Sequence, residues 1–375
     1  MERPNKEAFR AFGKLCVFCA KKPKDKTLEH IAPKWLLDIT DTSRKGFDSH
    51  WDKSALTAFS SLVLPACNDC NNHFAKLEGQ AKPIIEKLLN RQNPSVVEID
   101  IILDWLDKVR VGLWIVELIR SKNPVGIIPK FGISDRVGQK DRFLKLSYFK
   151  HDRPALSFTA TSTAAFHFSP SCFGIVINDL YIINCSFDMA TSPWLGYPYA
   201  KMSEPEHSDS MIHLERIIEG TKEAGSPPWR TDFVGAGTYA IQPICSIWDG
   251  DTKSKIEWTD DYSKTDAISV EDRKGAIFSS SNLKEFSRLR LGSHFELKSV
   301  NAPAQNRVFS LANLEILKLQ KYICSTAYRY PKVLLPWIST PEAALNELDQ
   351  LIFVENEVVK TALGLRLPNA TKLLL

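Results

Sequence analysis

The chain has 375 residues, of which 44% are hydrophobic and 25% charged, and its formal net charge is +4. This is the composition of an ordinary soluble protein that is too long for one average domain, and so mild a charge does not by itself indicate a nucleic-acid partner. No segment approaches the roughly 20 uninterrupted apolar residues of a membrane span, and the charged first thirty residues exclude the apolar region of a signal peptide. We therefore expect a cytoplasmic location.

Residues 1–95 have few long apolar runs, as in a small module that depends on a metal for stability. Residues 96–120 form a dense apolar stretch and predict a mostly buried helix. This stretch also contains a few charged residues, namely Asp104, Asp107, Lys108, Arg110 and Glu117. Residues 121–142 are rich in Pro and Gly and predict a linker or long loop.

Beyond residue 142 the pattern changes to short runs of β-branched and aromatic residues, which predict strands. These runs cover residues 143–149, 156–168, 173–178, 180–187 and 232–248. Helices are predicted for residues 311–329 and from Pro341 to about residue 363, with Thr340 as the N-cap. The fold class is therefore α+β: a metal-stapled module at 1–95, a helix and linker at 96–142, and a larger mixed sheet-plus-helix domain at 143–375.

Eight cysteines are present, and four of them form two CxxC pairs, Cys16/Cys19 and Cys67/Cys70. Each CxxC turn presents both sulfurs on one side, and two such turns can complete tetrahedral zinc coordination. A site with four cysteine ligands leaves no position for water, so this zinc would be structural. The other four cysteines are isolated in apolar surroundings and are interpreted as buried small hydrophobic residues: Cys172, Cys185, Cys245 and Cys324.

Between the two pairs lies the motif Glu29-His30-Ile31-Ala32-Pro33, and Asn71 directly follows the fourth cysteine. This order resembles the HNH, or ββα-metal, endonucleases, and especially the zinc-braced recombination endonuclease VII branch. The resemblance covers about residues 10–80. It implies that His30 is the general base, and that Glu29 and Asn71 hold a catalytic Mg²⁺ or Mn²⁺.

Two departures from the HNH pattern stand out. The family usually has Asp at the position of Glu29, and its middle Asn is absent from residues 59–65, where a Ser could replace it in bracing the loop. The chemistry still suits a nuclease, because an imidazole can deprotonate water and oxygen ligands suit Mg²⁺.

Glu78 lies on the same helix face as Asn71, about two turns later. We expect it to have at most a supporting role or a basic partner.

The basic residues of the N-terminal segment are expected to bind backbone phosphates. Residues 1–40 carry nine Lys/Arg against five Asp/Glu. The candidates nearest to the motif are Lys21, Lys22, Lys24, Lys26 and Lys34. By contrast, His73 is interpreted as a surface or packing residue, and Trp35 as part of the module's core.

Two functions remain open at this stage. The first is a metal-dependent endonuclease acting on DNA, whose second domain serves substrate recognition, regulation or oligomerisation. Its layout suits a bacterial defence effector that is switched on by a nucleotide ligand. The second is a catalytically inactive zinc-binding module that holds nucleic acid or a protein, suggested by the missing Asn and by Glu in place of Asp.

Overall fold

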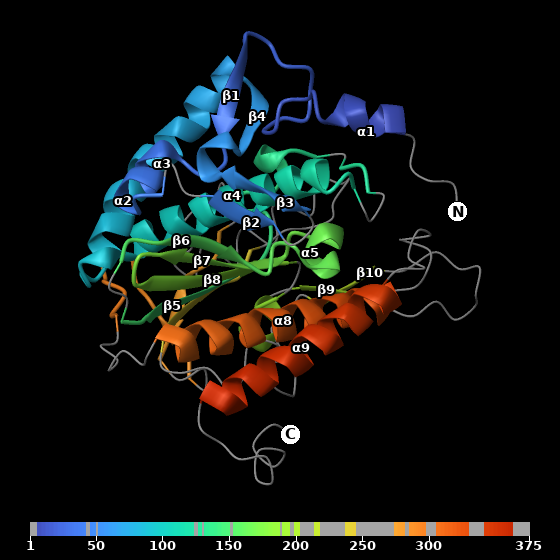
Figure 1. Ribbon diagram of the computed structural model, residues 1–375. Helices are drawn as coiled ribbons and strands as arrows, with labels where there is room; N and C mark the ends of the chain where they lie inside the picture. Colours follow the sequence, from blue (N-terminus) through green and yellow to red (C-terminus); the bar gives the residue numbers. More distant parts are fainter. Residues whose placement is uncertain are drawn as a thin grey trace.

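The computed structural model describes residues 6–42, 46–49, 52–123, 127–129, 131–150, 153–187, 190–195, 199–202, 214–217, 237–244, 274–281, 285–297, 305–329 and 341–362. These residues build a mixed structure of helices and antiparallel sheets, which confirms the predicted α+β class. A long central helix, α4, separates a small N-terminal module from a larger sheet (Figure 1).

The N-terminal module is built on a two-stranded hairpin followed by a helix. Strands β1 and β4 pair antiparallel, and α3 begins at the residue after β4. A second hairpin, β2 with β3, lies between them in the chain. In chain order the elements are α1 (Lys6–Phe12), β1 (Lys26–His30), α2 (Lys34–Ile39), β2 (Gly46–Ser49), β3 (Asp52–Ala58), the 3₁₀ turn η1 (Phe59–Ser61), β4 (Val63–Cys67) and α3 (Asn68–Leu89).

Helix α4 (Val96–Arg120) has the bounds that the apolar pattern predicts. Its start is set by a capping box, in which Glu98 N donates to Ser95 Oγ at 3.2 Å and Ser95 N donates to Glu98 Oε2 at 2.6 Å. Most of its side chains are buried, including charged ones, because the module covers one side and the large sheet the other. The helix is therefore part of the core rather than a connector on the surface.

The large sheet has seven strands in the order β13-β12-β11-β5-β8-β7-β6, and every neighbouring pair is antiparallel. Its strands are β5 (Arg142–Tyr148), β6 (Leu156–Thr159), β7 (Cys172–Ile177), β8 (Leu180–Ser186), β11 (Thr238–Gln242), β12 (Phe278–Ser280) and β13 (Ser287–Arg288). Outside this sheet are a small pair of strands and two short helices, β9 (Tyr199–Met202), β10 (Leu214–Ile217), α5 (Ala164–Phe168) and α6 (Ser192–Leu195).

Both faces of the sheet are covered by helices (Figure 1). Leu144 and Ile182 belong to the apolar cluster shared with α4, whereas Phe143 and Ile183 pack with the opposite cluster. That second cluster includes residues of α8 (Gln305–Arg329), which lies beside α9 (Pro341–Ala362). Because side chains of a strand alternate between faces, strands covered on both sides are buried at every position, which explains the mostly apolar runs in the sequence.

Two segments differ from the sequence-based expectation. The predicted strand at 156–168 ends at Thr159 and is followed by α5, because the Thr163 side chain accepts a hydrogen bond from Phe166 N at 3.1 Å and caps that helix. The predicted linker is partly buried: Ile133 N donates to Val17 O at 2.9 Å, which ties this segment to the first CxxC turn. Of the strand predicted at 232–248, β11 is described, and much of the remainder lies outside the described residues.

No helix within the described ranges has the length and apolar character to cross a bilayer. The prediction that the other cysteines are buried holds for Cys172 and Cys185, while Cys324 is partly buried. The prediction that they are isolated is wrong for the first two, which face each other on β7 and β8 with their sulfurs 2.9 Å apart. Cys245 lies outside the described residues.

Candidate metal centre and catalytic site

The four cysteines of the two CxxC pairs converge, although Cys19 and Cys67 are 48 positions apart along the sequence. Their sulfurs all lie within 4.8 Å of one another, and Cys19 Sγ is 3.9 Å from Cys67 Sγ. Two sulfurs bound tetrahedrally to zinc at about 2.3 Å are about 3.8 Å apart, so the spacing suits such an ion. Antiparallel pairing of Lys26 with Cys67 brings the second CxxC turn beside the chain that leaves the first.

The environment of these thiols favours a bound cation. Burial alone would raise the pKa of Cys16, but hydrogen bonds with the backbone of Cys19 and Cys67 outweigh it and lower the pKa. Burial and the negative charge of Cys16 raise the pKa of Cys70 to about 12. Four thiolates at this spacing repel one another, and a divalent ion would remove that cost. The residues therefore fit a structural metal.

An aromatic stack joins the cysteine cluster to α3. Phe18 lies within the first CxxC turn. The centroid of its ring is 4.4 Å from that of the Phe74 ring, and the two ring planes are 6° apart. Both side chains are buried. His73 is exposed, as expected for a surface residue, and Trp35 packs against the core with its ring 5.7 Å from that of Trp105. The start of α3 is thus held by packing as well as by the cysteines.

His30 ends β1 and is partly exposed. Its Nδ1 is buried and has no hydrogen-bond partner among the residues that the structure describes. Burial and the nearby Lys34 ammonium lower the pKa of His30, while the Ser60 backbone acts in the opposite direction. The lowered pKa favours the neutral imidazole, which is the form that accepts a proton.

The loop facing His30 is closed by a serine hydroxyl. Ser61 Oγ donates to Ala58 O at 2.8 Å within the turn η1, which lies between β3 and β4. This is the segment in which the sequence suggests that a Ser braces the loop in place of an Asn. A hydroxyl thus braces the turn that carries the Ser60 backbone toward His30.

Glu29 is turned to the other side of β1. It is 6% exposed, against an intermediate exposure for His30, as strand alternation requires. Its Oε1 lies 2.5 Å from Lys108 Nζ on α4, and the same ammonium contacts Glu78 of α3. Burial raises the pKa of Glu29, and Lys108 opposes that shift. Glu78 therefore does have a basic partner, which sequence spacing alone could not name.

Asn71 lies in the first turn of α3 and is oriented by β1. Its Nδ2 donates to Thr27 Oγ1 at 2.7 Å and approaches Leu28 O at 3.4 Å, so its Oδ1 is the atom left for a ligand. Among the described residues, Glu29 and its neighbours do not form a second group of converging ligand atoms like that of the cysteines. Because Glu29 is already paired with Lys108, the residues do not fit a divalent ion held jointly by Glu29 and Asn71 in this arrangement.

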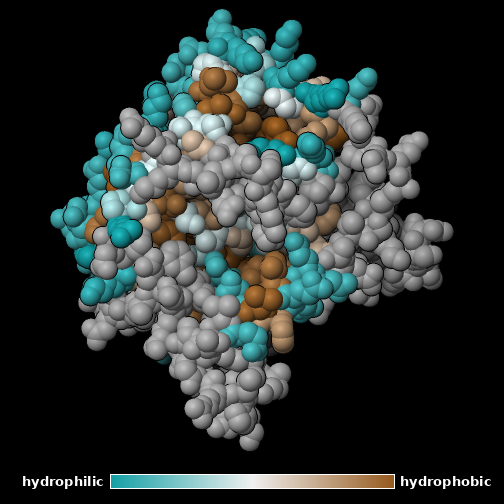
Figure 2. Space-filling view, in the orientation of Figure 1, coloured by the Kyte–Doolittle hydropathy of each residue, from teal (hydrophilic) through white to brown (hydrophobic). Residues whose placement is uncertain are grey.

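The five lysines proposed to bind phosphates are all exposed: Lys21, Lys22, Lys24, Lys26 and Lys34. The first three lie between the first CxxC turn and β1, Lys26 begins β1, and Lys34 begins α2. Figure 2 shows hydrophilic surface gathered over the N-terminal module at the top of the view. A basic, solvated surface therefore surrounds the strand that ends at His30.

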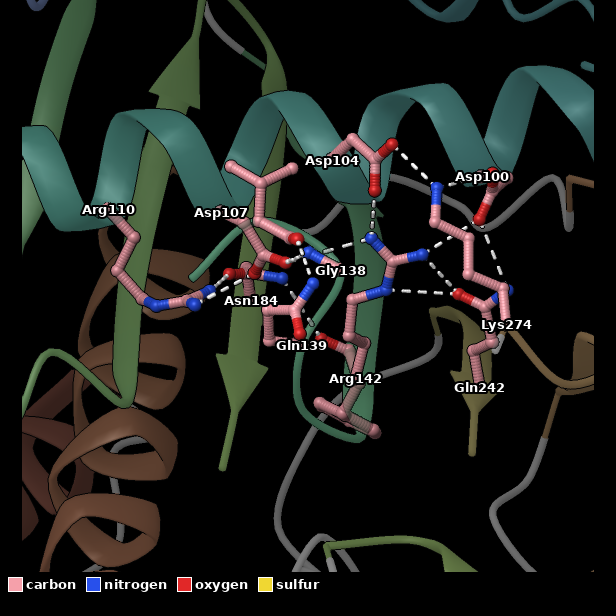
Figure 3. A network of polar contacts seen from close by, with 12 residues as sticks. Asp100, Asp104, Asp107, Arg110, Gly138, Gln139, Arg142, Asn184, Gln242 and Lys274 are labelled. Carbon is pink, nitrogen blue, oxygen red and sulfur yellow. Dashed lines mark hydrogen bonds and ion pairs between the residues drawn. The ribbon is translucent and has the colours of Figure 1, made fainter. Parts of the chain in front are cut away.

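Helix α4 also carries a buried polar network that joins it to the large sheet (Figure 3). Arg142 extends from β5 toward the helix, and its Nη2 lies 2.7 Å from Asp100 Oδ1 while its Nη1 lies 2.5 Å from Asp104 Oδ1. Lys274 contacts the same two carboxylates at 3.0 and 2.6 Å. Burial would lower the pKa of Arg142, but the aspartates raise it. Sequence reasoning missed this network because its members are far apart along the chain.

Comparisons of the chain with protein-family models, with curated proteins and with solved structures find no match.

Proposed function

We propose that this chain is a metal-dependent endonuclease of the HNH type that hydrolyses phosphodiester bonds in DNA. The observation that carries the proposal is the order and packing of the module. Strand β1 ends at His30 and pairs with β4, and β4 leads through the second CxxC pair into α3 beside the cysteine cluster. A structural zinc on the four cysteines would hold this arrangement. A nuclease base needs a neutral imidazole at the surface, and His30 meets that need.

The roles of the remaining residues follow from the same proposal. His30 would accept the proton of the attacking water, and the exposed lysines from Lys21 to Lys34 would bind the backbone on either side of the cut. A catalytic Mg²⁺ or Mn²⁺ would supply positive charge to the phosphate, and Asn71 Oδ1 is free to take part in holding it. The sequence-based prediction that Glu29 shares this ion is not part of the proposal, because Glu29 is paired with Lys108. The roles in defence and nucleotide sensing for residues 143–375 stay predictions from the sequence.

The deciding experiment compares His30→Ala with His73→Ala in zinc-loaded protein on supercoiled plasmid with Mg²⁺ or Mn²⁺. His73 is exposed on the same module and serves as the matched control. The His30 variant should keep its zinc and its fold but lose about 10² to 10⁴-fold in nicking rate, the usual contribution of a general base. Equal nicking by both variants and the wild type would refute the role of His30.

The alternative function, a zinc-binding module without catalysis, is favoured by one observation: the carboxylate beside His30 is already neutralised by Lys108. Filter binding of DNA with no nicking in any divalent ion would support this alternative. Metal-dependent nicking that His30→Ala abolishes would exclude it.

A further inference from the structure

Lys108 is placed where a catalytic cation would be expected. Its side chain is 1% exposed, and its ammonium contacts the carboxylates of Glu29 and Glu78, whose side chains are 7% and 19% exposed. The same Nζ lies 6.0 Å from the Phe18 ring, above the aromatic stack of the first CxxC turn. Three elements of the module, β1, α3 and the cysteine turn, thus meet on one side chain of α4.

A divalent ion and this ammonium compete for the same carboxylate. Mg²⁺ binds oxygen at about 2.1 Å, so an ion on Glu29 would come within roughly 5 Å of Lys108 Nζ in a buried site. Two cations so close in a low dielectric repel strongly. A buried carboxylate needs a counter-charge, and Lys108 already provides one.

The pairing also controls which way β1 faces. Because neighbouring side chains of a strand point to opposite sides, drawing Glu29 inward turns His30 outward, where Lys34 is near enough to lower its pKa. If β1 shifted by one residue against β4, Glu29 would face outward and His30 inward. Loss of the ammonium would leave the carboxylates of Glu29 and Glu78 facing each other without a cation.

We propose that Lys108 is the resident cation of the Glu29 site, in place of a divalent ion, and a positioning residue for His30. The role of Lys108 in positioning His30 rests on the function proposed above. Its role as the cation at Glu29 does not depend on that function. Any catalytic divalent ion then binds without Glu29, and Lys108 is what keeps Glu29 and Glu78 from binding one.

The test measures Mn²⁺ binding by the full-length, zinc-loaded chain, using electron paramagnetic resonance and the Mn²⁺-induced change in melting temperature. Lys108→Met should melt lower than the wild type, recover on adding Mn²⁺, and bind Mn²⁺ on the order of tenfold more tightly, because it uncovers two carboxylates. Lys108→Arg, which keeps the charge, should behave like the wild type. The matched control is Lys145→Met, which breaks a buried pair with Glu315 (2.9 Å) on the other face of the sheet and should melt lower without recovery by Mn²⁺.

If Lys108→Met fails to fold, Glu29→Gln in the wild-type background still tests whether Glu29 binds a divalent ion. The proposal requires that this change leaves Mn²⁺ affinity within about twofold of the wild type. A large loss of Mn²⁺ binding in Glu29→Gln would overturn the proposal, and so would equal Mn²⁺ responses of Lys108→Met and Lys145→Met. Plasmid nicking is scored separately, so a failure of the nuclease proposal is distinguishable from a failure of this one.

Discussion

Replacement of Cys67 by Ser tests whether a metal holds the N-terminal module together. Cys67 is central to the cluster: its Sγ lies 3.9 Å from Cys19 Sγ and accepts a hydrogen bond from Lys24 N at 3.4 Å, while its backbone N donates to Cys16 Sγ at 3.2 Å. It also directly precedes α3. A serine oxygen at this position is a shorter and much poorer zinc ligand than a thiolate.

The expected effect is large compared with the stability of a domain. Structural zinc contributes about 10–16 kcal/mol of binding free energy at neutral pH, whereas a whole domain is stable by only about 5–15 kcal/mol. The module's own core, built around Phe18, Phe74 and the β1–β4 hairpin, is small. Cys67→Ser should therefore lose most of its zinc, and the module should unfold well below the melting temperature of the wild type.

The assay is zinc content by mass spectrometry after gel filtration, together with thermal unfolding followed by circular dichroism. Cys324→Ser is the matched control, since Cys324 lies on α8 away from the cluster and should keep one zinc per chain. Chelation of the wild type should reproduce the Cys67→Ser result. A full zinc content in Cys67→Ser, or an unchanged melting curve after complete zinc removal, would refute the reasoning.

Two further predictions concern helix α4. Burial raises the pKa of Glu117 to about 7 from 4.5, so the folded state favours the protonated form and stability falls as pH rises from about 4.5 to 7. In urea unfolding, Glu117→Gln should therefore be more stable than the wild type by about 3 kcal/mol at pH 8 and nearly equal to it at pH 4.5. An equal gain in stability at both pH values would contradict this prediction. Arg142→Met should cost about 3 kcal/mol in the same assay, because Asp100 and Asp104 lose the more buried of their two cations and keep only Lys274. The control is Lys321→Met, which breaks an exposed pair with Asp349 and should cost less than about 1 kcal/mol. Equal losses of stability in the Arg142 and Lys321 variants would show that Arg142 contributes no more than a surface ion pair.

Local patterns predicted the parts of this fold that local interactions determine. The bounds of α4 follow from an apolar run and from the capping residues Ser95 and Glu98, which are three positions apart. The convergence of the cysteines follows from the chemistry of two CxxC turns. The short helix α5 was missed because its apolar residues also suit a strand, and the signal that decides between them is a single cap at Thr163.

The partners of the buried charges could not be predicted from the sequence. Lys108 contacts Glu29 across 79 positions, and Arg142 contacts Gln242 across 100. Such pairs form because α4 lies between two layers of the fold. The periodicity of the sequence does not indicate which basic residue pairs with which acidic residue. A buried helix that carries charged residues was the available signal, and it indicated that partners exist without naming them.

The position of α4 has a consequence for how this protein can be divided. A fragment ending at residue 95 would contain every cysteine ligand and His30, yet it would lack Lys108 and would expose apolar surface that α4 normally covers. The smallest transferable unit therefore extends at least to Arg120. Since the other side of that helix is bonded to the sheet through Asp100 and Asp104, transplanting the unit into another protein requires new partners for those carboxylates.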